Sequence, residues 1–212
     1  MVPANPRLGT SVLSLMLLAG AFAAARQQPS SELTERGQIV LSGHSSPYII
    51  HHLPVSSFPA LPVAVQTQLE LRGCLIPQTY EAHRPENVVH ASLQERGSSD
   101  WAVLCSVRGM VSLLVFFTGS PARPVSPSAG QPFVLASAPE TERLQAHDPS
   151  GVLGFNWGID PATPQRVADA QAGMDPHPPR LDHDALGDSV IDRNTIYHFY
   201  AKSAWTLVEL PD

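Results

Sequence analysis

Residues 87–117 read NVVHASLQERGSSDWAVLCSVRGMVSLLVFF and contain the strongest strand pattern in the chain. Three apolar runs, at 87–93, 101–107 and 111–117, are rich in the β-branched and aromatic residues that strands favour. The breaks between them have the length of hairpin turns. The stretch therefore predicts three consecutive antiparallel strands, arranged as a meander.

A second strand pair is predicted at the C-terminal end of the chain. Residues 195–200 and 204–210 are strand-like, and the three residues Ala201, Lys202 and Ser203 separate them. Loops of this length commonly join two antiparallel strands. The sequence thus predicts a C-terminal hairpin with a three-residue connection.

One helix is predicted at 62–72. Val65 and Leu69 lie four residues apart, Pro62 suits the first helical position, and Gly73 is a typical C-terminal stop. Proline accounts for 21 of the 212 residues, and proline interrupts helices. We therefore expect short helices, with a second short one at 164–172.

The chain has two cysteines, Cys74 and Cys105. In an oxidising compartment an even number of cysteines indicates a disulfide, although two buried free thiols are the alternative. A bridge here would join the end of the predicted helix to the middle strand of the meander. It would stabilise the fold by about 3 to 4 kcal/mol in the chain-entropy model.

These elements together predict an α+β fold. We expect mainly antiparallel β-sheet, consisting of the meander and the C-terminal hairpin, with one packed helix and a single disulfide. The apolar fraction of 43% and the charged fraction of 15% are typical of a globular protein. The net charge of −6 argues against nucleic acid as a partner, because phosphate binding needs a basic face.

The first 25 residues have the features of a secretory signal peptide. Arg7 supplies a positive charge, an apolar run covers 12–25, and small residues precede Arg26 at the expected cleavage point. An uncleaved interfacial anchor or a misassigned start codon are the alternatives. No later segment reaches the 18 apolar residues of a membrane span. We expect a periplasmic or secreted protein.

The mature chain is predicted to begin with a flexible tail and to continue as one domain. Residues 26–38 are polar and show neither helical nor strand periodicity, so they are interpreted as the tail. Order is expected to begin near Ile39. Residues 39–212 are then long enough for a single globular domain.

Residues 91–104 resemble a single degenerate unit of the FG-GAP repeats of integrin-type propellers. Gly97, Asp100 and the strand that follows fit the repeat. The positions at which such repeats place calcium-binding carboxylates hold Ser92, Gln94 and Arg96. Calcium is not expected, since it needs several oxygen ligands. We instead expect Gly97 and Asp100 to be turn residues, with Asp100 accepting backbone N–H bonds.

An acidic cluster at 182–192 is the candidate site with the most ligand-type side chains. It contains Asp182, His183, Asp184, Asp188 and Asp192. If this segment is helical, the last three aspartates share one face and could hold a divalent cation. The alternative is that one aspartate caps a short helix while the others are solvated.

The sequence contains none of the common nucleophile or cofactor motifs. No cofactor is therefore expected, apart from a divalent cation at the acidic cluster. The general pattern is similar to that of uncharacterised exported bacterial proteins, a resemblance that implies no activity. We expect a non-catalytic binding or envelope-associated module with an unknown protein or envelope ligand. The alternative is a metal-dependent, hydrolase-type enzyme that uses residues 182–192.

Overall fold

A computed structural model describes residues 33–120, 123–124, 131–147, 149–191, 193 and 195–211, together with Met1. The predicted signal peptide lies outside the described residues apart from Met1, and so do residues 26–32 of the predicted tail. Of the described residues, 48% lie in strands and 14% in helices, so the fold is mostly β. The α+β prediction is confirmed. No helix in the described ranges has the length and hydropathy needed to cross a membrane.

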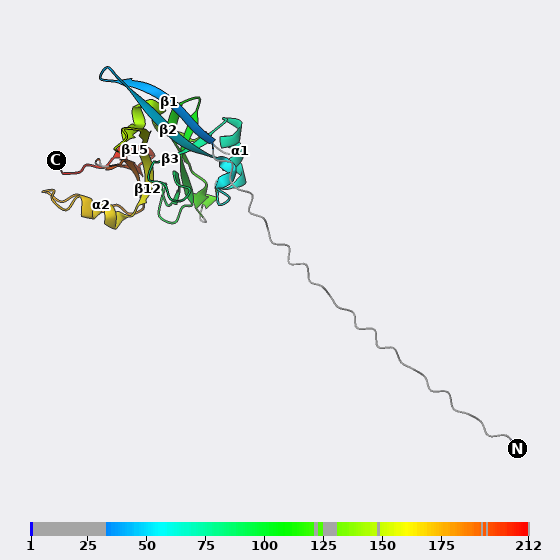
Figure 1. Ribbon diagram of the computed structural model, residues 1–212. Helices are drawn as coiled ribbons and strands as arrows, with labels where there is room; N and C mark the ends of the chain where they lie inside the picture. Colours follow the sequence, from blue (N-terminus) through cyan, green and yellow to red (C-terminus); the bar gives the residue numbers. More distant parts are fainter. Residues whose placement is uncertain are drawn as a thin grey trace.

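Within the described residues, nine strands form the main sheet, in the order β10-β11-β2-β3-β5-β6-β9, with β1 paired to β2 and β4 paired to β5. They are β1 (Leu33–Leu41), β2 (His44–Pro54), β3 (Leu75–Gln78), β4 (Val88–Ala91), β5 (Asp100–Val107), β6 (Met110–Phe116), β9 (Phe133–Pro139), β10 (Leu144–Ala146) and β11 (Leu153–Phe155). The β11–β2 pair is parallel and the others are antiparallel. The long β1–β2 hairpin extends beyond the rest of the sheet (Figure 1).

A second, antiparallel sheet has the order β12-β13-β14-β15. Its strands are β12 (Trp157–Ala162), β13 (Ala185–Val190), β14 (Thr195–Ala201) and β15 (Ala204–Leu207). The remaining elements are the short pair β7 (Gly119–Ser120) and β8 (Arg123–Pro124), the helices α1 (Val63–Leu71) and α2 (Pro164–Ala170), and the 3₁₀ turns η1 (Val55–Ser57) and η2 (Glu140–Arg143).

Both predicted strand units are present, with one correction. Strands β4, β5 and β6 form the antiparallel meander, and β14 pairs with β15. The connection of this last hairpin has two residues, not three. Lys202 and Ser203 have φ values of 51° and 64°. Two successive positive φ values are the requirement of a type I′ turn, which matches the twist of the strands it joins.

Helix α1 matches its predicted position to within one residue at each end. Pro62 is the N-cap and not the first helical residue. At the other end Gly73 has a φ of 71°, and the Cys74 N–H donates to the Leu69 carbonyl at 3.0 Å. This is a Schellman-type stop, in which glycine adopts the left-handed conformation without steric cost.

The ordered domain begins earlier in the chain than the predicted start near Ile39. Strand β1 begins at Leu33, so residues 33–38 of the predicted tail belong to the sheet. Its side chains are mostly exposed, which explains why the segment lacks a hydrophobic pattern. The backbone hydrogen bonds to β2 hold it in place over its whole length.

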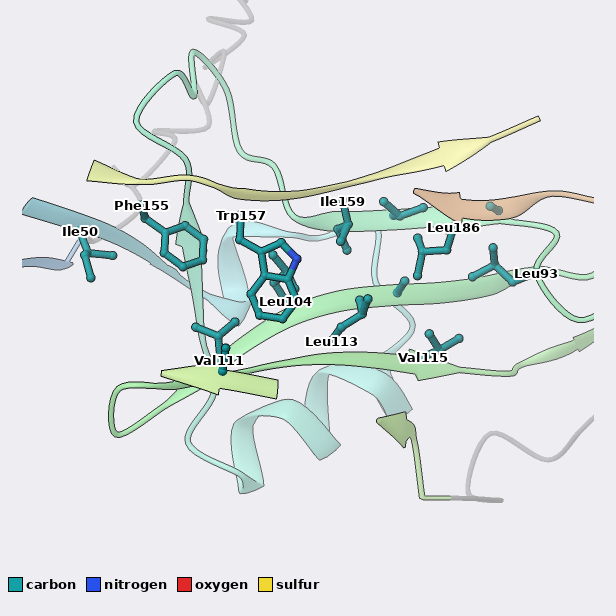
Figure 2. Close-up of a cluster of buried hydrophobic side chains, with 14 residues drawn as sticks. Ile50, Leu93, Leu104, Val111, Leu113, Val115, Phe155, Trp157, Ile159 and Leu186 are labelled. Carbon is teal, nitrogen blue, oxygen red and sulfur yellow. The ribbon is translucent and has the colours of Figure 1, made fainter. Parts of the chain in front are cut away.

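Two hydrophobic cores lie on opposite faces of the main sheet. One is enclosed between the two sheets and contains Leu104 and Trp157, both fully buried (Figure 2). The other lies between the main sheet and α1 and contains Val103 and Leu69. Neighbouring residues of β5 thus enter different cores, which explains its continuous apolar run.

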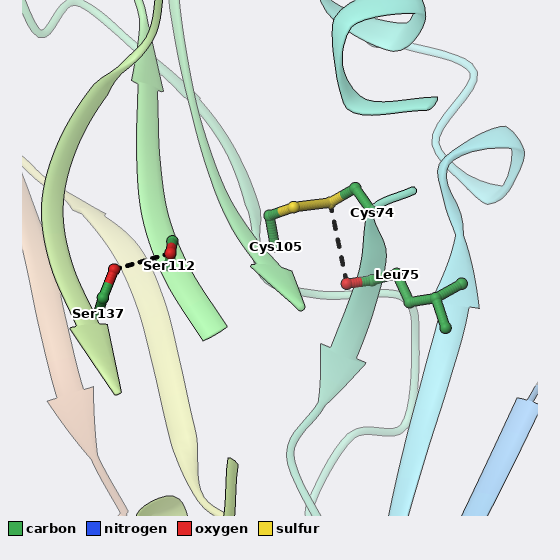
Figure 3. Close-up of a disulfide and its surroundings, with 5 residues drawn as sticks. All are labelled: Cys74, Leu75, Cys105, Ser112 and Ser137. Carbon is green, nitrogen blue, oxygen red and sulfur yellow. Dashed lines mark hydrogen bonds between the residues drawn. A yellow bond between two sulfur atoms is a disulfide. The ribbon is translucent and has the colours of Figure 1, made fainter. Parts of the chain in front are cut away.

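The predicted disulfide is confirmed. Cys74 and Cys105 are bridged, and their Cα atoms are 5.3 Å apart, within the usual range for a disulfide. The bridge joins Cys74, three residues after the end of α1 and directly before β3, to Cys105 in strand β5 (Figure 3). In the same region a hydrogen bond of 2.7 Å between the Ser112 and Ser137 hydroxyls links β6 to β9.

Candidate functional site

The described residues of the acidic cluster do not bring three ligand-type atoms together as a metal site would require. Its central part is strand β13, so the helix on which the predicted metal site depended is not formed there. Strand β13 pairs on both sides within the second sheet, which holds its backbone extended. Asp192 lies outside the described residues.

The carboxylates of this cluster have separate partners. Asp184 Oδ2 accepts the Ser92 N–H at 3.1 Å, and Asp182 Oδ1 lies 2.7 Å from His183 Nδ1. That contact with His183 lowers the pKa of Asp182. Asp188 accepts from the Trp157 indole at 2.6 Å and contacts His198 at 3.1 Å. Asp184 and Asp188 thus bond to different parts of the fold, whereas Asp182 contacts the neighbouring residue of the cluster.

The predicted turn residues are found in the β4–β5 connection. Gly97 has a φ of 80°, and Asp100 is fully buried. The Asp100 carboxylate accepts backbone N–H bonds from Leu93 and Gln94, at 3.0 and 2.8 Å. This is the bonding that the turn interpretation of Asp100 predicts.

A different group of residues has the geometry of a ligand site. Among the described residues, ligand-type atoms of Glu35, His52 and Glu140 all lie within 4.8 Å of one another. His52 is 4% exposed and Glu140 is 2% exposed, while Glu35 lies at the surface. We call these three residues the Glu–His–Glu site. It combines two buried titratable groups with one side open to solvent.

The β1–β2 register brings Glu35 to this position. Glu35 pairs with Ile50, so Tyr48 and His52, two residues to either side of Ile50, lie on the same face of the hairpin. The Tyr48 ring lies over Gly37, where an added Cβ would be 2.5 Å from the ring. From there the Tyr48 hydroxyl donates to Glu35 Oε1 at 3.0 Å.

Glu140 enters the site from η2. His52 Nε2 lies 2.7 Å from Glu140 Oε1, and Ser106 also hydrogen-bonds to this carboxylate. Burial by itself would raise the pKa of Glu140, but the hydrogen bonds from His52 and Ser106 outweigh it, so the pKa is lowered. The Glu140 carboxylate is therefore the acceptor in these bonds.

The lowered pKa predicts a pH-dependent contribution to stability. The ordinary value is 4.5, so the unfolded chain binds a proton at Glu140 before the folded protein does as the pH falls. The stabilisation is present above about pH 4.5 and is lost as the pH falls through the lower, folded-state pKa. Glu140→Gln should lower the free energy of unfolding by about 1 to 2 kcal/mol at pH 7, and by less at pH 3.

Urea unfolding at several pH values between 3 and 7 tests this prediction. Glu142→Gln, an exposed neighbour, is the matched control and should change stability little. A Glu140→Gln deficit that does not shrink as the pH falls would contradict it.

The sequence indicates only one of the residues of this site, the buried histidine. Histidines 51 and 52 are adjacent, and because a strand alternates its side chains they point to opposite sides of β2. His52 is buried against Glu140, while His51 contacts Thr34 on the other side. Glu140 is 88 residues from His52 along the chain. Only the tertiary fold brings the two together.

Comparisons with protein-family models, with curated proteins and with solved structures find no match for this chain. The likeness of residues 91–104 to an FG-GAP unit therefore stays a prediction. The inference of function rests on the geometry of the site.

Proposed function

We propose that this protein is a non-catalytic binding module that works outside the cytoplasm, and that it takes its ligand at the Glu–His–Glu site. The observation that carries the proposal is the buried His52–Glu140 pair next to the exposed Glu35. Placing two titratable groups in a protein interior is costly unless they are paired or bind something. An open side beside such a pair supports a role in binding.

The electrostatics favour binding over acid–base catalysis. A general acid or base works best with a pKa near the operating pH. The pKa of Glu140 is lowered, away from neutrality. The pKa of Tyr48 is raised from 10.0, chiefly by burial and by its bond to Glu35, so this phenol remains a donor. The site thus offers two carboxylates, which suit a cationic ligand.

Three features support the location. Residues 1–25 have the pattern of a cleavable leader, Cys74 and Cys105 form a disulfide, and the described helices include no membrane-crossing segment. Disulfides persist in oxidising compartments such as the periplasm or the extracellular space. We propose a periplasmic or secreted protein whose partners are an envelope component or a small ligand.

Intact mass of the exported protein, with and without reductant, tests the location. We expect a chain that begins near Arg26, two hydrogens lighter than its reduced form, because cleavage removes the leader and oxidation removes one hydrogen per cysteine. Alkylation should modify the chain only after reduction. A full-length chain with two alkylatable thiols would contradict export.

Native mass spectrometry tests the binding role. Protein purified from the exported fraction should retain a ligand or partner, and His52→Gln should lose it because the buried pair is broken. His51→Gln, on the opposite face of β2, is the matched control and should retain it. Sustained turnover in a panel of hydrolase substrates would overturn the non-catalytic assignment.

A further inference from the structure

We propose that the ligand of the Glu–His–Glu site is a divalent transition-metal ion of the zinc class. This inference rests on the proposed binding function and names its ligand. The ion would be held by His52 Nε2 and by one carboxylate oxygen each from Glu35 and Glu140. A water molecule on the solvent side, next to Glu35, would complete the coordination.

The spacing of the three groups suits such an ion. Bonds of about 2.1 Å in tetrahedral geometry place two ligand atoms about 3.4 Å apart. The existing spacings bracket this value, since His52 Nε2 and Glu140 Oε1 are 2.7 Å apart and all three ligand atoms lie within 4.8 Å. Small side-chain rotations would therefore form the site without a change in the backbone.

Each carboxylate already has an orienting hydroxyl. Tyr48 donates to Glu35, and Ser106 hydrogen-bonds to Glu140. Outer-shell partners of this kind orient the ligands in metal sites and stabilise the bound state. Gly37 belongs to the same arrangement, because any side chain there would displace the Tyr48 ring.

The charge and the donor set select the class of ion. Two carboxylates and a neutral imidazole carry a charge of −2, which balances a divalent cation. An imidazole nitrogen suits zinc, cobalt or nickel, whereas calcium and magnesium prefer sites made only of oxygen ligands.

The experiment uses tag-free, metal-free mature protein titrated with zinc by calorimetry and with cobalt by visible absorption. We expect one ion per chain and a cobalt spectrum typical of four- or five-coordination. His52→Gln and Glu35→Gln should each weaken binding by at least about 10- to 100-fold, since losing a ligand costs at least as much as losing an outer-shell partner. His51→Gln should bind as the unmodified protein does. Calcium and magnesium should not compete.

The Glu35→Gln variant keeps the test decisive, because Glu35 is exposed and its replacement leaves the core unchanged. If the unmodified protein binds zinc and cobalt no more tightly than a Glu35→Gln, His52→Gln double variant, the metal inference is overturned. Native mass spectrometry then separates the two proposals. If the protein retains a non-metal ligand that His52→Gln loses, the proposed binding function is still supported. If the protein retains no ligand, both the metal inference and the proposed binding function are overturned.

Discussion

Replacing Asp100 by alanine should lower the free energy of unfolding by about 4 to 5 kcal/mol. The Asp100 carboxylate is fully buried and accepts three backbone N–H bonds, from Leu93, Gln94 and Thr118, at 2.8 to 3.2 Å, together with a short bond from the Ser98 hydroxyl. Removing it leaves these donors without an acceptor in a place that water does not reach. Hydrogen bonds to a charged group contribute about 1.5 to 3 kcal/mol each, and buried unpaired donors are costly.

The Asp100→Asn variant distinguishes the effect of the side chain's shape on stability from the effect of its acceptor oxygens. The amide fits the same space, but one of its two positions becomes a donor that faces other donors, so a loss of about 2 to 3 kcal/mol is expected. Asp160→Asn, an exposed change on β12, should alter stability by less than about 0.5 kcal/mol. Urea unfolding followed by tryptophan fluorescence measures all three. An Asp100→Ala loss below about 1 kcal/mol would show that water replaces the carboxylate.

The sequence predicted the elements whose pattern is local. The meander could be predicted because β5 and β6 are apolar on both faces. Helix α1 could be predicted because Pro62 and Gly73 mark its ends. Strand β1 was missed because its side chains face solvent and only its backbone pairs with β2. Hydrophobic patterns report burial, and an exposed strand has none.

The Glu–His–Glu site could not be predicted from the sequence for a related reason. An acidic cluster is visible in a sequence, yet Asp184 and Asp188 have structural partners elsewhere in the fold. The Glu–His–Glu site joins residues from a hairpin and from a distant 3₁₀ turn, and no spacing along the chain reports it. Its one local clue was the pair His51 and His52, because strand alternation sends one of them inward.

The second large expected effect is at the contact between the two sheets, where Asn87→Ala should cost about 4 kcal/mol. Asn87 is 2% exposed, and its side-chain amide makes three hydrogen bonds to backbone groups. It donates to the carbonyls of Pro77 and Trp157, at 2.7 and 3.2 Å, and accepts the Ile159 N–H at 3.1 Å. One side chain thus bonds β12 of the smaller sheet to β3 of the main sheet.

Two causes contribute to this loss, and a pair of variants distinguishes them. Asn87 has a φ of 66°, a left-handed conformation that asparagine tolerates better than alanine does. Asn87→Gly loses the same three hydrogen bonds but adopts this conformation freely, so it should be about 1 kcal/mol more stable than Asn87→Ala. Urea unfolding measures both. If Asn87→Gly were as stable as the unmodified protein, the amide would not hold the sheets together, and their contact would depend on the apolar core around Trp157 alone.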